Sequence, residues 1–533
     1  MSIGKENKTA TDKNVCLEYS HVIVGGGSAG AVLASRLSEN PAFHILLLEA
    51  GEVFAEDKYP ELLSNSQIIA GNGNPTYDWG YQSVPNDEGH VISIPRGKVL
   101  GGSSAVNAAV ALRGIPNDFK RFANMGLGEW AWEEVLPYYK KLEKSNMDNQ
   151  QWHGHTGYLP INQLSQADLS PMQAAFMKAA QAKKYDHTTD FNGHMQYGVG
   201  AYPVNIINGL RMNTGMTYLN QSVRQRVNLT IMGQVLADRI LFKNGKATSV
   251  LAADGRIFSA ENIILSSGTY GTAAILQRSG IGPKDLLQPL GIPVIADLPV
   301  GKNFVDHPFY FNSYAADLHQ IGSLTPVTGV NLWTRSSYAE MGDLDIHITA
   351  GHLFDPEQSP TKAGFVIGIA LTNPKSKGFI KITSHQAEAP LLIDLNFLSV
   401  EEDRQRLLQG FKLSRELAQT APLKDLALEE LTPGSQVNDD EQIMKIIKQN
   451  LQTYNHPVAS APMGLKGSRV AVVDAWGNVH GLKGLRVVDA SILPDFISSG
   501  TNVTVIMAAE KIADEIKRVA LLKENVKQRT DLW

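Results

Sequence analysis

The sequence predicts an α/β protein in which a parallel sheet is assembled from separated segments, accompanied by an α+β domain that contains a mostly antiparallel sheet. Three apolar runs indicate the parallel sheet, because such runs are typical of strands buried on both faces: residues 22–24, 263–265 and 485–488. If all three join one sheet, the chain leaves this domain and later returns to it. The excursion between the second and third runs is then a second domain.

The first run leads into a glycine-rich turn and a helical segment, which together predict a Rossmann-like dinucleotide-binding unit. Gly25 permits the tight turn, Gly27 lets the backbone approach a pyrophosphate, and Gly30 lets the helix pack on the strand. Glu49 ends the next apolar strand, 19 residues after Gly30, and is placed to accept hydrogen bonds from an adenosine ribose. Its carboxylate disfavours a 2′-phosphate, which leaves NAD or FAD. A glycine turn with a purely steric role is the alternative.

A second glycine block occupies residues 97–107, with the sequence GKVLGGSSAVN. Two adjacent glycines followed by two hydroxyl groups and an amide allow the backbone to approach a ligand closely while donors face it. A loop that is rich in glycine for steric reasons alone is the alternative. Trp79 follows a Gly-, Asn- and Pro-rich loop at residues 71–75, and we expect it either to touch a cofactor ring or to anchor the loop.

Composition argues against several classes of protein. The formal net charge is −5 and 19% of the residues are charged, so no basic field favours nucleic acid. Cys16 is the single cysteine, which excludes an intrachain disulfide and a Cys-based zinc cluster. His153 and His155 lack acids nearby in the sequence, so no metal site is expected. Neither a secretion signal nor a bilayer-spanning run is found, and we expect a cytoplasmic protein without a membrane span.

The middle of the chain differs in pattern from the first part. Ile380 and Ile382 alternate with polar residues, as in a half-solvated antiparallel strand. Ser399 and Glu402 form a capping box that predicts a helix running through Phe411. We therefore expect a nucleotide-binding domain at residues 18–303 and 466–522, a substrate-binding domain at residues 304–465, and flexible ends at residues 1–17 and 523–533.

Two polar residues near the C-terminus have side chains suited to acid–base chemistry. His456 lies in the segment Tyr-Asn-His-Pro, and Asn502 precedes an apolar helical run at residues 506–512. An imidazole can accept a hydroxyl proton at neutral pH, and a neighbouring amide can orient an alcohol oxygen. Taken alone, a structural role is commoner for one of 14 histidines. No GxSxG segment occurs, which argues against a serine hydrolase.

Considered together, the motifs give a specific resemblance. The glycine turn, the GKVLGGSSAVN block, residues 268–283, the His-Pro pair at His456 and the ending GLRVVDAS…SGTNVTVIMAAEK resemble the glucose-methanol-choline (GMC) family of FAD-dependent oxidoreductases. The resemblance runs from about residue 20 to about residue 515, and within the family the chain is similar to bacterial choline dehydrogenases and hydroxymethylfurfural oxidases. It implies FAD-dependent oxidation of a small-molecule alcohol to an aldehyde or ketone by hydride transfer, with oxygen or a separate electron acceptor.

The resemblance also implies roles for individual residues. His456 becomes the catalytic base, and Asn502 matches the position at which the family has His or Asn facing the flavin N5. Glu49 is expected on the adenosine ribose, Val235 near the adenine, and Asp489 and Ala490 near the ribityl chain and flavin. The pyrophosphate is expected at Gly25, Gly27, Ser28, Ala29 and Gly30. The flavin is expected at Leu100, Gly101, Gly102, Ser103, Ser104, Asn107, Ala108, Ala109 and Val110, and Trp79 and Arg96 complete the predicted cofactor site.

The chain departs from the family pattern at two places. Val106 stands where some members attach FAD through a histidine, so non-covalent FAD is expected. The stretch from Ala459 to Pro462 departs from the usual HPxGTCxMG pattern, which affects the edge of the site but keeps the base. Two other activities occur on this scaffold: hydroxynitrile cleavage, and light-driven fatty acid decarboxylation, whose branch lacks a histidine at the position of His456.

Overall fold

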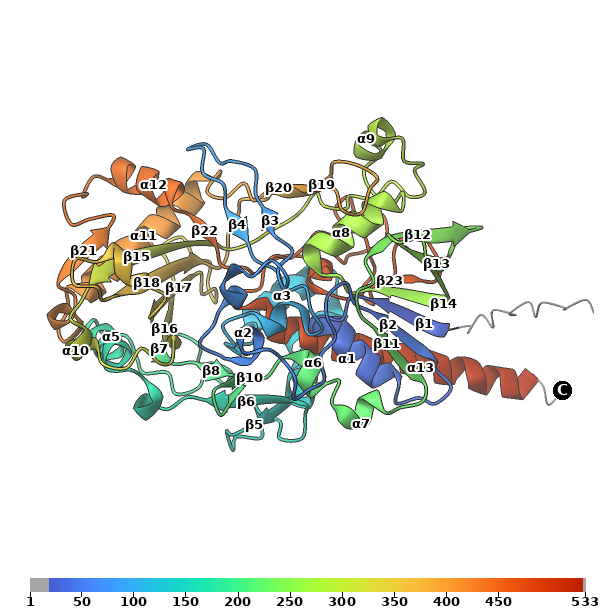
Figure 1. The fold of residues 1–533 in the computed structure, drawn as a ribbon, viewed down its shortest axis with the longest axis horizontal. Coiled ribbons are helices and arrows are strands. Elements are labelled where there is room, and N and C mark those ends of the chain that lie inside the picture. The colour runs from blue at the N-terminus through green and yellow to red at the C-terminus, as the bar shows by residue number, and fades with distance from the viewer. Residues whose placement is uncertain (1–18, 531–533) are drawn as a thin grey trace, which may run out of the picture.

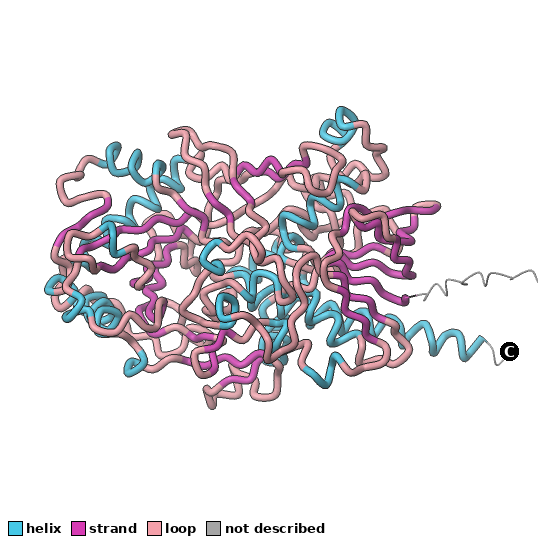
Figure 2. Tube along the Cα trace, in the orientation of Figure 1, coloured by secondary structure: helices cyan, strands magenta, loops and turns pink. Residues whose placement is uncertain are grey.

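The computed structural model describes residues 19–530, which fold around two sheets with loops and short helices between them (Figure 1). One seven-stranded sheet belongs to the nucleotide-binding part and the other seven-stranded sheet to the substrate-binding part. Loops occupy much of the region between the two sheets (Figure 2). Within residues 19–530, no helix combines the length and apolar character needed to cross a bilayer. Cys16 and the predicted flexible residues 1–17 lie outside the described residues.

The nucleotide-binding sheet has the strand order β11-β2-β1-β14-β13-β12, with β23 paired to β14. The pairs of β1 with β2 and β14, of β2 with β11, and of β14 with β23 are parallel, whereas β12, β13 and β14 pair antiparallel. Leu265 is in register with both Val24 and Val487, so the three apolar runs join one sheet as predicted. The strands are β1 (Tyr19–Val24), β2 (Ile45–Leu48), β11 (Leu229–Met232), β12 (Ala237–Lys243), β13 (Lys246–Ala252), β14 (Ile257–Leu265) and β23 (Leu485–Val487).

Two helices from opposite ends of the chain pack together beside this sheet. Helix α1 (Ser28–Leu37) begins directly after the glycine turn, and α13 (Thr501–Thr530) is the last helix. Arg36 on α1 contacts the buried carboxylate of Glu510 on α13 at 2.8 Å. Helix α13 continues to Thr530, so residues 523–530 are helical rather than the flexible end that the sequence indicated.

The substrate-binding sheet is antiparallel throughout, with the order β21-β15-β18-β17-β16-β7 and β22 paired to β15. Its strand β7 comes from residues 198–201, so the segment before residue 303 contributes to both sheets. Helices α5 (Pro171–Ala182) and α11 (Glu401–Ala418) pack against it. The strands are β7 (Gly198–Ala201), β15 (Pro308–Ala315), β16 (Thr328–Thr334), β17 (Ile346–Gly351), β18 (Gly364–Leu371), β21 (Glu429–Thr432) and β22 (Gln452–Thr453).

Two local expectations for the middle region have different outcomes. Strand β19 (Phe379–Ile382) pairs antiparallel with β20 (Leu391–Asp394), as the alternation predicted. The prediction of a capping box at Ser399 and Glu402 is wrong, because the N-cap residue of α11 is Val400 and no side-chain hydrogen bond caps the helix. Glu402 ion-pairs with Lys375 and Arg406 instead of reaching back along the chain. Acidic residues in the first turn stabilise the helix start through the dipole.

The remaining elements are short or connect the two sheets. They include α2 (Glu61–Ser64), α3 (Pro116–Asn124), α4 (Trp132–Leu142), α6 (Thr214–Thr217), α7 (Gln221–Arg224), α8 (Gly268–Arg278), α9 (Lys284–Leu287), α10 (Leu318–Ile321), α12 (Asp440–Gln449), β3 (Tyr81–Gln82), β4 (Ser93–Ile94), β5 (Glu143–Ser145), β6 (Leu159–Gln163), β8 (Pro203–Val204), β9 (Ile206–Ile207) and β10 (Leu210–Arg211).

Candidate active site

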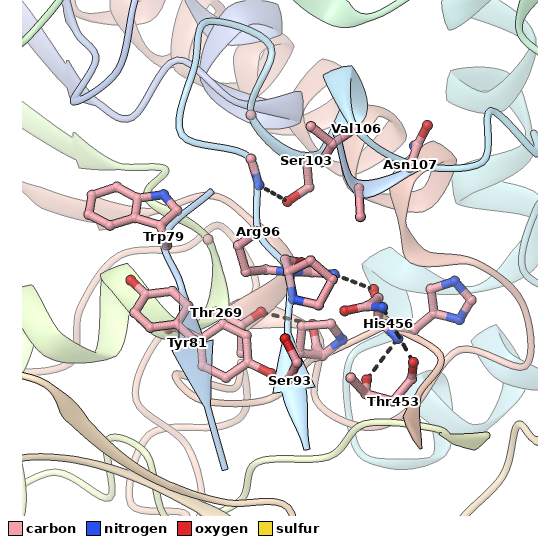
Figure 3. Close-up of a pocket in the computed structure, with 18 of the residues that line it drawn as sticks. Trp79, Tyr81, Ser93, Arg96, Ser103, Val106, Asn107, Thr269, Thr453 and His456 are labelled. Carbon is pink, nitrogen blue, oxygen red and sulfur yellow. Dashed lines mark hydrogen bonds between the residues drawn. The ribbon is translucent and has the colours of Figure 1, made fainter. Parts of the chain in front are cut away.

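A cavity of about 1640 Å³ brings residues of both glycine blocks together with residues of the substrate-binding sheet. Its wall includes the glycine turn, the second glycine block, the start of α8, the start of α13 and one face of β15 and β17. Figure 3 shows His456 and Thr453 on one side, Trp79 and Tyr81 on the other, and Ser103, Val106 and Asn107 of the second glycine block above them.

The glycine turn has the geometry that the sequence predicted. Gly25 has a φ of +99°, a conformation that L side chains rarely adopt. A Cβ on Gly30 would lie 1.9 Å from the carbonyl oxygen of Gly25, so a side chain is excluded there by the protein itself. A Cβ on Gly27 would meet no protein atom closer than 3.7 Å and would point into open space at the N-terminus of α1. Gly27 therefore keeps clear a space that the protein does not fill.

Glu49 lies at the end of β2 with both carboxylate oxygens engaged by the backbone. One oxygen accepts from the N–H of Gly26 and the other from the N–H of Gly51, each at 2.8 Å. Burial raises the pKa of Glu49 to about 7, although these backbone hydrogen bonds oppose the shift. The carboxylate lines the cavity, and its remaining lone pairs can accept from hydroxyl groups of a ribose.

The second glycine block packs directly against the first. Gly101 and Gly102 both have positive φ, and a Cβ on Gly102 would lie 2.7 Å from the Cα of Gly27. The hydroxyl of Ser104 donates to the carbonyl of Gly101 at 2.6 Å, which fixes the turn from behind. Two glycine segments in backbone contact therefore form one continuous wall.

Most of the predicted cofactor residues line the cavity. They are Gly25, Gly27, Ser28, Ala29, Glu49, Trp79, Arg96, Gly102, Ser103, Asn107, Ala108, Val110, Val235, Asp489, Ala490 and Asn502. The others do not line it and instead support the wall: Gly30, Leu100, Gly101, Ser104 and Ala109. Of these, Leu100 accepts a hydrogen bond at its carbonyl from Tyr59, and Ala109 has a φ of +55° held by the side chain of Asn107.

Asp489 connects the end of β23 to the start of α8. One carboxylate oxygen accepts from the N–H of Gly268 at 2.9 Å and from the hydroxyl of Thr272 at 2.6 Å. The other accepts from the N–H and the hydroxyl of Ser491. Burial raises the pKa of Asp489. All these contacts are within the protein, so Asp489 holds two elements of the cavity wall in place.

Asn502 lies beside the glycine turn. Its Oδ1 accepts a hydrogen bond from the hydroxyl of Ser28 at 2.7 Å, and its Nδ2 is buried without a partner in the part of the chain that the structure describes. A buried amide N–H₂ facing a cavity is a donor for a ligand, because leaving it unsatisfied costs free energy. Together with the open space at Gly27 and the carboxylate of Glu49, this donor fits a bound dinucleotide.

His456 lies partly buried in the cavity wall, near the buried His307 and His347. Its Nδ1 is 3.1 Å from the Nδ1 of His307, and its Nε2 is 3.3 Å from the position of a Cβ built on Gly500. Burial lowers the pKa of His456 well below its ordinary value, and His307, His347 and Arg96 lower it further. The ring is therefore neutral at neutral pH and able to accept a proton.

Gly500 lies next to Nε2 of His456. Asn502 follows two residues later, in the first turn of α13, where its carbonyl oxygen is taken by Ser28. The structure thus brings His456 and Asn502 into one cavity but assigns Asn502 to the glycine-turn side. Because Gly500 carries no side chain, Nε2 is not crowded by a Cβ, which would lie only 3.3 Å from it.

A buried carboxylate ties the two histidines together through the backbone. Asp306 Oδ1 accepts from the N–H of His307 at 2.7 Å and from the N–H of His456 at 2.8 Å, while Oδ2 accepts from the hydroxyl of Thr453 at 2.6 Å. Burial raises the pKa of Asp306 to about 6, with these hydrogen bonds and Arg96 opposing the shift. Nothing in the sequence alone places the Asp-His-Pro segment at residues 306–308 beside His456.

Aromatic rings extend the wall from His456 along β15. Tyr454 lies 4.5 Å from His456 between ring centroids, Phe309 stacks on Tyr454 at 4.4 Å, and Phe311 meets Phe309 at 4.5 Å. Phe309 and Phe311 share one face of β15 because side chains alternate along a strand. His347 of β17 lines the same cavity, and burial lowers its pKa to about 3. Sequence analysis missed all four residues, since aromatic residues on a buried strand are typical of core packing.

His153 lies among acidic residues that its neighbours in the sequence did not indicate. Its Nε2 lies 2.9 Å from Asp190 and its Nδ1 3.3 Å from Glu143, which in turn contacts Arg113 at 2.6 Å. The side chain is buried rather than solvated. Asp190 follows 37 residues later, so the sequence around His153 did not reveal these acids.

The sequence of this chain was compared with protein-family models and with known proteins. Residues 19–309 match the N-terminal model and residues 374–509 the C-terminal model of the family described as GMC oxidoreductase. An oxygen-dependent choline dehydrogenase from Pectobacterium carotovorum subsp. carotovorum (strain PC1) is 33% identical over 94% of this chain and 95% of that protein. The protein of the same name from Pseudomonas putida (strain KT2440) is 33% identical over 94% of both chains.

Solved structures have the same fold. Pyridoxine 4-oxidase from Mesorbium loti superposes with a TM-score of 0.86 and 30% sequence identity, covering 94% of this chain and 99% of that chain. A mutant of formate oxidase from Aspergillus oryzae RIB40, described for its FAD modification, superposes with a TM-score of 0.84 and 25% identity, covering 96% and 99%. In each case the similarity spans both sheets and the cavity between them.

Proposed function

The chain belongs to the GMC oxidoreductase family, and from that premise we propose that His456 is the base in its reaction and that the substrate is an uncharged alcohol. The family membership makes the chain an FAD-dependent oxidoreductase acting on CH–OH groups. The observation that supports the role of His456 most directly is a neutral, partly buried imidazole in the cavity wall, with only the glycine Gly500 beside its Nε2.

The residues around the glycine turn suit FAD. Gly27 and the N-terminus of α1 would hold the pyrophosphate, Glu49 would accept from the ribose, and the free amide of Asn502 would donate to the cofactor. Val106 lines the cavity with a side chain that cannot form a covalent link, which favours non-covalent FAD. When bound, FAD supplies the acceptor for the hydride that leaves the alcohol carbon.

His456 would take the hydroxyl proton of the alcohol as the C–H bond is cleaved. Proton transfer to a well-placed base is worth about 10²- to 10⁴-fold in rate. Asp306 holds the His456 backbone in place, so that the ring does not have to be ordered when substrate binds. The lack of a side chain at Gly500 would leave Nε2 accessible to the hydroxyl group from the cavity.

The substrate side of the cavity favours an uncharged molecule. On β15 and β17 its wall presents aromatic rings and small neutral residues, such as Phe311, Ser313 and Thr349. The carboxylates of Asp355 and Glu388 also line the cavity, from loops outside these two strands. Arg96 is close enough to lower the pKa of His456, so its positive charge disfavours a cation at that place. The buried carboxylate nearest His456, Asp306, is already engaged by three donors. We therefore propose an aryl or alkyl primary alcohol rather than a quaternary ammonium alcohol.

Anaerobic mixing with alcohols tests this proposal. Benzyl alcohol should bleach the flavin faster than choline at equal concentration, and air should restore the yellow colour if oxygen is the acceptor. His456→Ala should keep FAD but reduce the flavin about 10²- to 10⁴-fold more slowly. His352→Ala, which removes a histidine bonded to Ser170 away from the cavity wall, should behave like the parent.

Three results would count against it. Unchanged flavin reduction in His456→Ala would remove the base from the mechanism. Preference for choline over benzyl alcohol would contradict the electrostatic reading of the cavity. Conversion of a cyanohydrin without bleaching would indicate a lyase.

A further inference from the structure

We propose that the substrate is an elongated, uncharged primary alcohol whose apolar chain lies along one face of the substrate-binding sheet, from His456 to a mouth at residues 353–358. The inference rests on the proposed function, because it concerns the shape of the molecule on which the base at His456 would act. Three consecutive rows of side chains on this face carry it, since each row contributes residues to the wall of the cavity that contains His456.

The first row lies beside His456. Strand register places His347 of β17 next to Ala370 of β18, and Ala370 next to Phe309 of β15. Phe309 stacks on Tyr454 at 4.4 Å between ring centroids. Tyr454 in turn lies 4.5 Å from His456 and 6.2 Å from His347. Because Phe309 and His347 both line the cavity, the row begins where the reacting hydroxyl group is expected.

The second row continues the wall two residues further along each strand. Thr349 of β17 pairs with Gly368 of β18, which pairs with Phe311 of β15. A Cβ on Gly368 would lie 2.5 Å from the ring of Phe309 and 3.2 Å from that of Phe311, so both rings lie over this glycine. The hydroxyl of Thr349 donates to the carbonyl of Val330 at 2.8 Å and is already paired. This row therefore offers mainly aromatic carbon to a ligand.

The third row reaches the end of the sheet. Gly351 of β17, Val366 of β18 and Ser313 of β15 are in register, and all three line the cavity. Strands β15 and β17 each advance four residues between the first and third rows, a length of about 14 Å in an antiparallel sheet. The one titratable side chain in the three rows is His347, and burial lowers its pKa to about 3, so its ring is neutral. The path along the sheet is therefore long and uncharged.

The cavity reaches the surface just beyond the third row. The loop between β17 and β18 contributes Leu353, Phe354, Asp355 and Gln358 to its wall, and Leu353 is 41% exposed. A Cβ on Gly364 would lie 2.5 Å from the ring of Phe354, so this ring packs on the first residue of β18 and holds the loop at the end of the sheet. Asp355 is exposed at this mouth, which disfavours a negatively charged end of the substrate.

A molecule that fills this path needs both length and an apolar surface. Benzyl alcohol with its hydroxyl group at His456 would cover the first row and leave the third row, about 14 Å away, unfilled. An alkyl chain on the CH–OH carbon would reach the third row while burying its CH₂ groups against the rings of Phe309 and Phe311. The alternative is that the path serves only for entry, and then chain length would have no effect on the rate.

The chain-length profile of the parent holoenzyme tests the inference directly. Flavin reduction is followed anaerobically with ethanol, 1-butanol, 1-hexanol and 1-octanol, and its second-order rate constant is compared. We expect this constant to rise up to about fourfold for each added CH₂ group, and the value for 1-octanol to exceed that for ethanol at least about 100-fold. A flat profile, or a maximum at ethanol, would overturn the inference without any variant.

Substitutions in the third row test where the chain lies. Ser313→Phe adds a ring to this row and should lower the ratio of the rate constants for 1-octanol and 1-butanol about tenfold or more. Thr328→Phe narrows the same row from β16, next to Gly351, and serves if Ser313→Phe does not fold. Ser222→Phe adds the same ring at an exposed position of α7 outside the cavity wall and should keep the parent ratio.

The outcomes distinguish this inference from the proposed function. If Ser313→Phe and Thr328→Phe fold and slow both alcohols equally, the path serves only for entry and the inference is overturned. Bleaching by benzyl alcohol together with a flat profile for the 1-alkanols overturns the inference and leaves the proposed function intact. If no alcohol bleaches the flavin, or if His456→Ala keeps the parent rate, the proposed function is rejected and the inference falls with it.

Discussion

Replacing Gly27 with leucine should separate cofactor binding from folding. A Cβ at Gly27 would meet no protein atom closer than 3.7 Å, and the residue has a φ of −78°, which any L residue adopts. The folded chain should therefore lose only about 1 kcal/mol, the usual cost of a poor N-cap residue. The side chain would instead occupy the space at the N-terminus of α1 where the pyrophosphate is expected. We expect FAD to bind at least about 100-fold more weakly, which corresponds to about 2.8 kcal/mol.

Two further glycines supply matched controls. In Gly30→Ala the Cβ would lie 1.9 Å from the carbonyl oxygen of Gly25, so the turn itself must shift and the apoprotein should lose about 3 kcal/mol or more. In Gly128→Leu the added Cβ would meet nothing within 4 Å, and neither folding nor flavin content should change. The assay combines flavin absorbance per chain after gel filtration, thermal unfolding of the apoprotein and fluorescence titration with FAD. A folded Gly27→Leu protein with full flavin content would refute the reasoning.

Two other predictions concern residues whose surroundings the sequence did not reveal. Asn502→Ala should weaken FAD binding about tenfold, because it removes a buried donor and the acceptor for Ser28, and it should change the KM for alcohol less. Titration with FAD and steady-state kinetics measure the two effects, and a larger effect on the KM would place Asn502 on the substrate side. Burial lowers the pKa of His153, but contacts with Asp190 and Glu143 outweigh it and raise the pKa to about 9, above the ordinary value of 6.5. This stabilisation is full below pH 6.5 and is lost as the pH rises through 9. In urea unfolding, His153→Gln should therefore have a lower free energy of unfolding than the parent at low pH, and the difference should disappear over that range. A difference that does not depend on pH would contradict the raised pKa of His153.

The nucleotide-binding half of the fold could be predicted because its signals are local. The glycine turn, the strand before it and the acid after the next strand lie within about 30 residues, and each has one steric or electrostatic reason for its place. The same locality explains the correct prediction of β14 and β23, whose apolar runs fit strands covered on both faces. Strand β7 was missed because its four residues contain two glycines and carry little pattern.

The candidate site was predicted less completely, because contacts between distant segments form it. The resemblance implied that Asn502 faces the flavin in the same site as His456, but it did not indicate that Gly500 lies next to Nε2 of the base. Gly500 directly precedes α13 and Asn502 is the second residue of that helix, so the two residues lie on different parts of the turn that begins it. A motif therefore identifies the segment, but only the start of α13 at Thr501 determines which residue faces His456.

The meeting of His307 and His456 follows from the pairing of β15 with β22. Pro308 is in register with Thr453, and the next bridge joins Val305 to Val458. Between these two bridges the chain advances by three residues on one side and by five on the other. The extra length bulges outward at Asn455, whose φ is +64°. Because a bulge redirects the side chains beside it, it turns His456 toward His307 instead of along the sheet. Asp306 fills the gap by accepting from the N–H of His456, so the carboxylate that stabilises this bulge also sets the distance between the two imidazoles.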